Sequence, residues 1–122
     1  MEWLWVILIV VFAVGWFALT RASFVPSAEA VRLLASGAVV IDVRTAGEFA
    51  KGHLPQALNI PLSEVRVQIG RHVPEKSRAV LVHCHAGGRS EIAKRQLKAM
   101  GYVNVHNLGS LARAQQIVSS AS

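Results

Sequence analysis

The sequence predicts an α/β domain of three layers, with a mostly parallel central sheet flanked by helices and one transmembrane helix ahead of it. Two observations predict the domain. Continuous apolar runs of strand length occur in the chain, and segments with helical spacing of apolar residues alternate with them. The third observation is an unbroken apolar run at the N-terminus, which predicts the additional helix. The length of 122 residues allows one compact domain.

The N-terminal apolar run extends from Trp3 to Leu19 without a charged side chain. As a helix it would measure roughly 26 Å, near the lower limit for crossing a bilayer. We expect a retained anchor over residues 3–20 rather than a cleaved signal peptide, because no basic residue precedes the run. Arg21 and Arg32 follow it, so the positive-inside rule predicts a single-pass protein of the inner (cell) membrane with a cytoplasmic domain. A periplasmic domain is the alternative.

The formal net charge of +6 comes mainly from scattered basic residues. Lys94, Arg95 and Lys98 form one basic helix face in the predicted structure. Nucleic-acid binding would need a denser basic stripe with interleaved aromatic residues, so we expect no nucleic-acid partner. Cys84 is the only cysteine of the chain, which excludes an internal disulfide.

The elements of the domain are predicted in chain order from caps, turns and apolar spacing. A linker over 21–27 leads to the domain at 28–122, and Ser27 is expected to cap its first helix. Helices are expected at 28–36, at 63–72, at 90–100 and in a closing segment after Gly109. Strands are expected at 38–43, 57–60, 79–83 and 102–105. The first and third are apolar runs, interrupted only by Asp42 and ended by His83, and they suit a buried parallel sheet.

The segment after the strand at 79–83 is the main candidate site, and it reads Cys84-His85-Ala86-Gly87-Gly88-Arg89-Ser90. Ligands of open α/β sheets bind outside the carboxyl ends of the strands. The two glycines can adopt conformations closed to other residues, and the N–H groups of such a turn bind anions. The positive end of the following helix and the charge of Arg89 add to this effect. Because these features favour a thiolate, Cys84 is predicted to be a nucleophile rather than an inert buried cysteine.

These residues resemble the rhodanese family, whose loop often runs Cys-x-x-Gly-x-Arg-Ser from the catalytic cysteine to a helix. Cys84, Gly87, Arg89 and Ser90 match that pattern. A second similarity lies upstream, in Ile41-Asp42-Val43-Arg44, Glu48-Phe49, Gly52-His53-Leu54-Pro55, Ala57 and Asn59-Ile60-Pro61. The resemblance covers about residues 28–112 and is strongest to small single-domain rhodaneses of the phage-shock type.

The resemblance implies a thiosulfate sulfurtransferase-like enzyme that needs no cofactor. The Cys84 thiolate would take the sulfane sulfur of a donor such as thiosulfate as a persulfide, and a nucleophilic acceptor, cyanide or a thiol, would remove it. The loop residues His85, Ala86, Gly87, Gly88, Arg89 and Ser90 would surround the persulfide and stabilise its charge. His85 stands where many relatives carry Arg or Lys, and it is only partly charged near neutral pH. We therefore expect this loop to be less basic than the loop of a dedicated thiosulfate enzyme.

Two other functions stay open at this point. Tyrosine-phosphatase-like enzymes use a similar cradle with the pattern Cys-x5-Arg, whereas four residues separate Cys84 from Arg89. The shorter loop suits one sulfur atom better than a phosphoryl group. The other alternative is a membrane-tethered rhodanese-like module that binds or regulates without activity, although inactive relatives usually lack the cysteine.

Asp42 and Arg44 are expected to act beneath the site as structural partners rather than as catalytic groups. A carboxylate within an apolar run must be paired, and Arg44 is the nearest cation. Arg44 and Glu48, four residues apart, form a second expected pair. We expect no metal at the stretch from His83 to His85, because successive strand residues point to opposite faces of a sheet.

Overall fold

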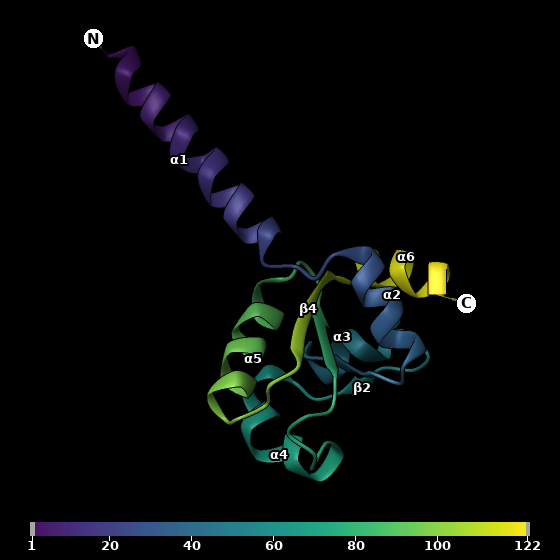
Figure 1. The fold of residues 1–122 in the computed structure, drawn as a ribbon. Helices are drawn as coiled ribbons and strands as arrows, with labels where there is room; N and C mark the ends of the chain where they lie inside the picture. Colours follow the sequence, from purple (N-terminus) through teal and green to yellow (C-terminus); the bar gives the residue numbers. More distant parts are fainter. Residues whose placement is uncertain (1, 122) are drawn as a thin grey trace.

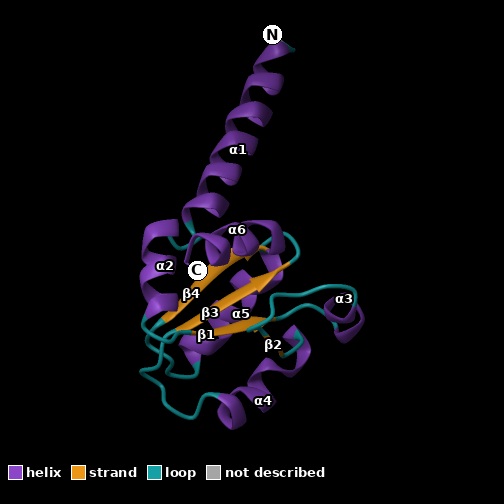
Figure 2. Cartoon of the chain, turned by 90° about the vertical axis from the view of Figure 1, so that its right-hand side faces the viewer, coloured by secondary structure: helices purple, strands orange, loops and turns teal. Residues whose placement is uncertain are grey.

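A four-stranded parallel sheet with the order β2-β1-β3-β4 forms the centre of the domain. The structure, a computed structural model, describes residues 2–121, and the side chains of residues 19–22 lie outside that description. The strands are β1 (Val39–Asp42), β2 (Leu58–Asn59), β3 (Val80–Cys84) and β4 (Val105–Ser110). Figure 2 shows the sheet between two layers of helices, which confirms the predicted three-layer α/β fold.

Each face of the sheet carries its own hydrophobic core. Helices α2 (Ser27–Ala35) and α6 (Leu111–Ala121) cover one face. The other face is covered by α4 (Val65–His72), which follows the 3-10 turn η1 (Leu62–Glu64), and by α5 (Gly88–Ala99). Successive side chains of β3 alternate between these cores, as the pleat of a strand requires. Leu81 therefore packs toward α2 and α6, and Cys84 toward α4 and α5.

The N-terminal helix α1 (Trp3–Ala22) projects away from the domain (Figures 1 and 2). Its apolar side chains are exposed, with Trp5 at 72% and Phe12 at 73%. Within the part of the chain that the structure describes, no helix combines the length and the apolarity needed to cross a membrane. The prediction of a helix at this end of the chain is confirmed, but the structure does not support its role as a transmembrane anchor.

The strand predicted at 102–105 is misplaced. Only Val105 belongs to β4, which continues to Ser110, and Gly109, expected to precede the closing helix, lies inside that strand. Tyr102 is buried instead, and its hydroxyl donates a hydrogen bond of 2.6 Å to the carbonyl of Val73. The ring of Tyr102 thus belongs to the core on the side of α4 and α5, outside any strand.

Three helix starts also differ from the prediction, and one of them is α5, which was expected to begin at residue 90 and begins at Gly88. Ser27 does not cap α2 but forms its first turn, and Pro26 takes the cap position without a side-chain hydrogen bond. Pro26 holds φ at −58°, and its carbonyl accepts the N–H of Ala30 at 3.0 Å, so the chain enters the helix without a side-chain cap. The helix expected at 63–72 is divided between η1 and α4.

Candidate active site

Cys84 is the last residue of β3, the strand between β1 and β4, and its side chain is 1% exposed. Its Sγ accepts a hydrogen bond of 3.0 Å from the N–H of Gly87 and one of 3.4 Å from the hydroxyl of Ser90. Gly87 has φ +105° and directs its N–H back toward the sulfur. Helix α5 begins at the next residue. The predicted loop therefore does close around the thiol of Cys84.

The surroundings of Cys84 favour its thiolate. Burial has the largest single effect and raises the pKa of the thiol. Hydrogen bonds from the Ser90 hydroxyl and from the N–H groups of Ser90, Gly87 and Ala86 act the other way, and together they hold the pKa of Cys84 below its ordinary value. A thiolate in such a setting is the nucleophilic form of cysteine.

Ser90→Ala is expected to move the pH midpoint of Cys84 alkylation upward, because the variant loses a hydrogen bond that favours the thiolate. A shift of about half a unit to one unit would slow alkylation below the midpoint about three- to tenfold. Since only the thiolate reacts, alkylation is lost as the pH falls through the pKa of Cys84. Rates of iodoacetamide alkylation, followed by intact mass, measure the midpoint. Ser120→Ala, at an exposed site in α6, is the control, and superimposable profiles of wild type and Ser90→Ala would refute the prediction.

Arg89 lies beside the loop but is engaged by an unexpected partner. Its guanidinium donates two hydrogen bonds, of 2.6 and 2.9 Å, to the carboxylate of Glu48. Those bonds are the main reason that the pKa of Glu48 falls to about 2. Glu48 is also held by Thr45, since the two residues form a capping box at the start of α3 (Ala46–Ala50). The carboxylate offsets the charge predicted for Arg89 and links α3 to the start of α5.

Asp42 and Arg44 form the predicted buried pair at the end of β1. The carboxylate of Asp42, which is 0% exposed, accepts hydrogen bonds from the backbone N–H and from Nε and Nη2 of Arg44, at 2.7 to 3.0 Å. Asn59 of β2 donates to both of their backbone carbonyls. Because this geometry occupies the guanidinium, the predicted pair between Arg44 and Glu48 is wrong. Asn59 thus joins the end of β1 to β2, and Arg44, which also donates to the carbonyl of Gly52 at 2.8 Å, ties the end of β1 to the turn after α3.

The other loop residues have separate roles. His85 is exposed, and its carbonyl accepts a hydrogen bond from the N–H of Leu111. Ala86 forms an isolated bridge with Ser110 of β4. Gly88 has an ordinary backbone conformation, so the prediction that both glycines need special freedom holds for Gly87 alone. Across residues 2–121, no group of three His, Cys, Asp or Glu side chains could hold a metal ion.

Asn107 is a site residue that the sequence analysis did not identify. It is buried in β4, where its Nδ2 donates to the carbonyl of Gly87 at 3.1 Å and its Oδ1 accepts from the N–H of Gly109 at 2.8 Å. It therefore joins the active-site loop to the neighbouring strand. The signal available in the sequence was a polar side chain between the apolar residues Val105 and Leu108, since a buried amide needs partners.

His83 is a second buried polar residue, on the face of β3 opposite Cys84. Its Nε2 has no hydrogen-bond partner among the described residues and lies 3.8 Å from Oδ2 of Asp42. Burial lowers the pKa of His83 more than the nearby carboxylate raises it. The imidazole of His83 is thus uncharged, and it packs against the buried pair of Asp42 and Arg44.

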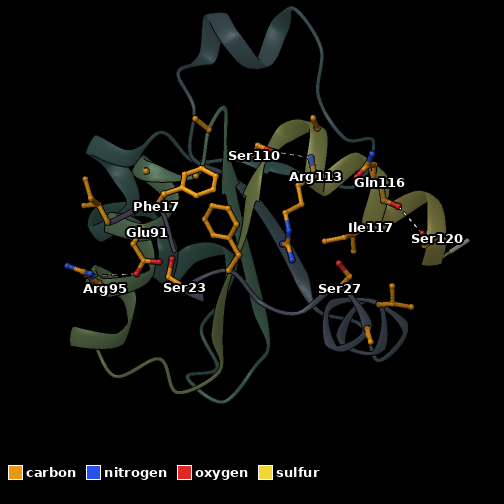
Figure 3. Close-up of a pocket in the computed structure, with 18 of the residues that line it drawn as sticks. Phe17, Ser23, Ser27, Glu91, Arg95, Ser110, Arg113, Gln116, Ile117 and Ser120 are labelled. Carbon is orange, nitrogen blue, oxygen red and sulfur yellow. Dashed lines mark hydrogen bonds and ion pairs between the residues drawn. The ribbon is translucent and has the colours of Figure 1, made fainter. Parts of the chain in front are cut away.

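A cavity of about 1500 Å³ lies against the outer side of the loop. It is lined by residues of the end of α1 and the following linker, of α2 and α6, and of the start of α5 (Figure 3). Phe17, Arg113 and Ile117 point into it, and the backbone from Ala86 to Gly88 forms part of its wall. The active-site loop therefore lies between the thiol on one side and an open space on the other.

Comparison with known proteins finds a family model and several sulfurtransferases that are similar to this chain. The family model of the Rhodanese-like domain matches residues 27–112. The thiosulfate sulfurtransferase PspE of Escherichia coli (strain K12) is 45% identical over 71 residues, which are 58% of this chain and 68% of that protein. A solved structure described as rhodanese with anions from E. coli has a TM-score of 0.61 at 42% identity, covering 63% of this chain and 91% of that one. The human single-domain sulfurtransferase TSTD1 has a TM-score of 0.64 at 30% identity, with coverage of 77% and 96%.

Proposed function

Since the chain belongs to the rhodanese-like domain family and is a rhodanese-type enzyme, we propose that it moves a sulfane sulfur from a donor such as thiosulfate to cyanide or a thiol through a persulfide on Cys84. The observation that carries the proposal is the position of Sγ, which receives the N–H of Gly87 and the hydroxyl of Ser90 in a loop of four residues between Cys84 and Arg89. Such a loop has donors for one anionic sulfur.

In the first half of the proposed cycle the Cys84 thiolate attacks the outer sulfur of thiosulfate. A bond forms between Sγ and that sulfur while the bond between the two donor sulfurs breaks, and sulfite leaves with the electron pair. The terminal sulfur of the persulfide then carries the negative charge. N–H groups fixed by the turn at Gly87 can stabilise this charge without reorganising, in the manner of an oxyanion hole.

In the second half the acceptor attacks the terminal sulfur. The bond from that sulfur to Sγ breaks, and its electron pair restores the Cys84 thiolate. Cyanide leaves as thiocyanate, and a thiolate leaves as a persulfide. Cys84 is the only cysteine in the chain, so the acceptor comes from outside it.

The test is to mix the protein with thiosulfate and record its intact mass. We expect the mass to rise by one sulfur atom, the adduct to disappear with release of thiocyanate when cyanide is added, and Cys84→Ser to show no adduct. Absence of an adduct together with Cys84-dependent turnover of an aryl phosphate would identify a phosphatase instead. Absence of both would identify a rhodanese-like binding module.

We propose separately that α1 holds the domain at a cell membrane, on the cytoplasmic side. The support is the exposure of a whole helix of apolar side chains, including Leu8 and Phe12, which packing with lipid would remove from water. The full chain should sediment with membranes, and a variant with Lys at both of those positions should not. Recovery of the wild-type chain in the soluble fraction would refute the proposal, and a reporter at the C-terminus would identify the side.

A further inference from the structure

Phe24 lies in the linker between α1 and α2, outside the residues 27–112 that match the family model, yet its ring contacts the active-site loop. A Cβ placed on Gly87 would lie 2.5 Å from Cζ and 2.8 Å from Cε1 of that ring. A Cβ placed on Gly109 would lie 2.9 Å from Cδ2 and Cε2. The ring therefore packs directly on the backbone of two glycines, both of which have positive φ.

The ring of Phe24 is held in place by β4 and α6. Phe24 forms a parallel bridge with Asn107, and the N–H of Val25 donates to the carbonyl of Asn107 at 2.9 Å. The guanidinium of Arg113 lies 5.5 Å from the ring centroid and donates to the carbonyls of Leu108 and Val25. These contacts leave the ring little freedom to move away from the loop.

Gly87 is the loop residue whose orientation decides the hydrogen bond to the thiol. Its N–H donates to Sγ of Cys84, while its carbonyl accepts from Nδ2 of Asn107 at 3.1 Å and shares the single hydroxyl proton of Ser90 with that sulfur. Glycine has more backbone conformations available than any other residue, so this orientation needs support from its surroundings. The cavity of about 1500 Å³ outside the loop, around Arg113 and Ile117 in Figure 3, would give the backbone room to rotate if the ring were absent.

We propose that Phe24 is a positioning residue for the nucleophile. Its ring blocks rotation of the Gly87 peptide and so keeps the N–H of Gly87 on the sulfur of Cys84, which favours the thiolate and, after sulfur transfer, the persulfide. The part that concerns the persulfide rests on the proposed function, and the part that concerns the thiolate does not. The linker after α1 thereby becomes a component of the active site.

The test compares Phe24→Ala and Phe24→Leu with wild type in the full-length chain. The Ala variant should raise the pH midpoint of Cys84 alkylation by about half a unit to one unit, which slows alkylation below the midpoint about three- to tenfold. The Leu variant, which keeps apolar volume but loses the ring, should lie between the two. Ile117→Ala is the control, because Ile117 is a buried apolar residue that lines the same cavity as Phe24, while the atoms nearest to Gly87 and Gly109 belong to other residues.

If Phe24→Ala folds, loses about as much stability as Ile117→Ala and keeps the wild-type pH midpoint of alkylation, the proposal is overturned. The role of Phe24 would then be apolar packing alone. If the Ala variant does not fold, the Leu variant decides, because an unchanged midpoint there has the same meaning. Alkylation needs no sulfur donor. A shifted midpoint in a protein that forms no persulfide would therefore refute the proposed function and leave the role of Phe24 intact.

Discussion

Replacing Gly87 by Ala should abolish most of the sulfur transfer and destabilise the fold. An L-residue at φ +105° is strained by about 1–2 kcal/mol. The new Cβ would also meet the ring of Phe24 at 2.5 Å, and overpacking of this kind costs about 1–3 kcal/mol. Relief of either strain turns the N–H away from Cys84, and loss of one such donor lowers rates about a hundredfold or more. Urea unfolding and the rate of persulfide formation measure the two effects.

Alanine substitutions at two other glycines separate the effect of backbone strain from the effect of the clash with Phe24. Gly101 has φ +100°, and no heavy atom of the described residues lies within 4 Å of an added Cβ, so Gly101→Ala should show the backbone strain without the clash. Gly88 has neither an unusual φ nor a near neighbour, so Gly88→Ala should be close to neutral in stability. If Gly87→Ala were no more damaging than Gly101→Ala and still formed the persulfide at the wild-type rate, the prediction would be wrong.

Arg44→Met should cause the largest loss of stability without touching the thiol. The carboxylate of Asp42 is fully buried and receives three side-chain hydrogen bonds from Arg44. Removing one partner of a buried ion pair leaves an uncompensated charge and typically costs about 3–5 kcal/mol. The midpoint of urea unfolding is the measurement, at a pH near neutrality.

Arg32→Met is the matched control for that variant. Arg32 pairs with Glu29 at 3.5 Å on the exposed face of α2, and surface pairs of this kind contribute about 0–1 kcal/mol. A loss in Arg44→Met as small as the loss in Arg32→Met would contradict the assignment of Asp42 and Arg44 as a buried ion pair. Addition of Asp42→Asn to Arg44→Met should recover part of the stability, because the double variant buries no charge.

The loop around Cys84 was predictable from the sequence because its determinants are local. An apolar strand, Gly87 and a helix start at Gly88 follow one another within a few residues, and together they bring N–H groups to the sulfur. The pair of Asp42 and Arg44 was predictable for the same reason, since the two residues are two positions apart and an isolated buried charge is excluded.

The contacts that could not be predicted join distant parts of the chain. Arg89 pairs with Glu48, 41 residues earlier, because the parallel pairing of β1 with β3 brings the segments after both strands to the same edge of the sheet. Arg44 is nearer to Glu48 in the sequence and lies at helical spacing from it, but the guanidinium of Arg44 is bonded to Asp42 instead. Tyr102 has the side chain of a strand residue, and tertiary packing took it into the core instead. Phe24 gave no sign of its role, because a single aromatic residue in a linker has no pattern.

The hydrogen bond from Asn107 to Gly87 has a consequence for the newly made protein. Synthesis proceeds from the N-terminus, so Cys84 is made well before Asn107, and β4 must dock beside β3 before the loop acquires this contact. Until then Gly87 lacks its neighbour and the thiol keeps the modest reactivity of a cysteine in an unfolded chain. The contacts that hold the loop against β4 therefore form only after the C-terminal quarter of the domain has been made.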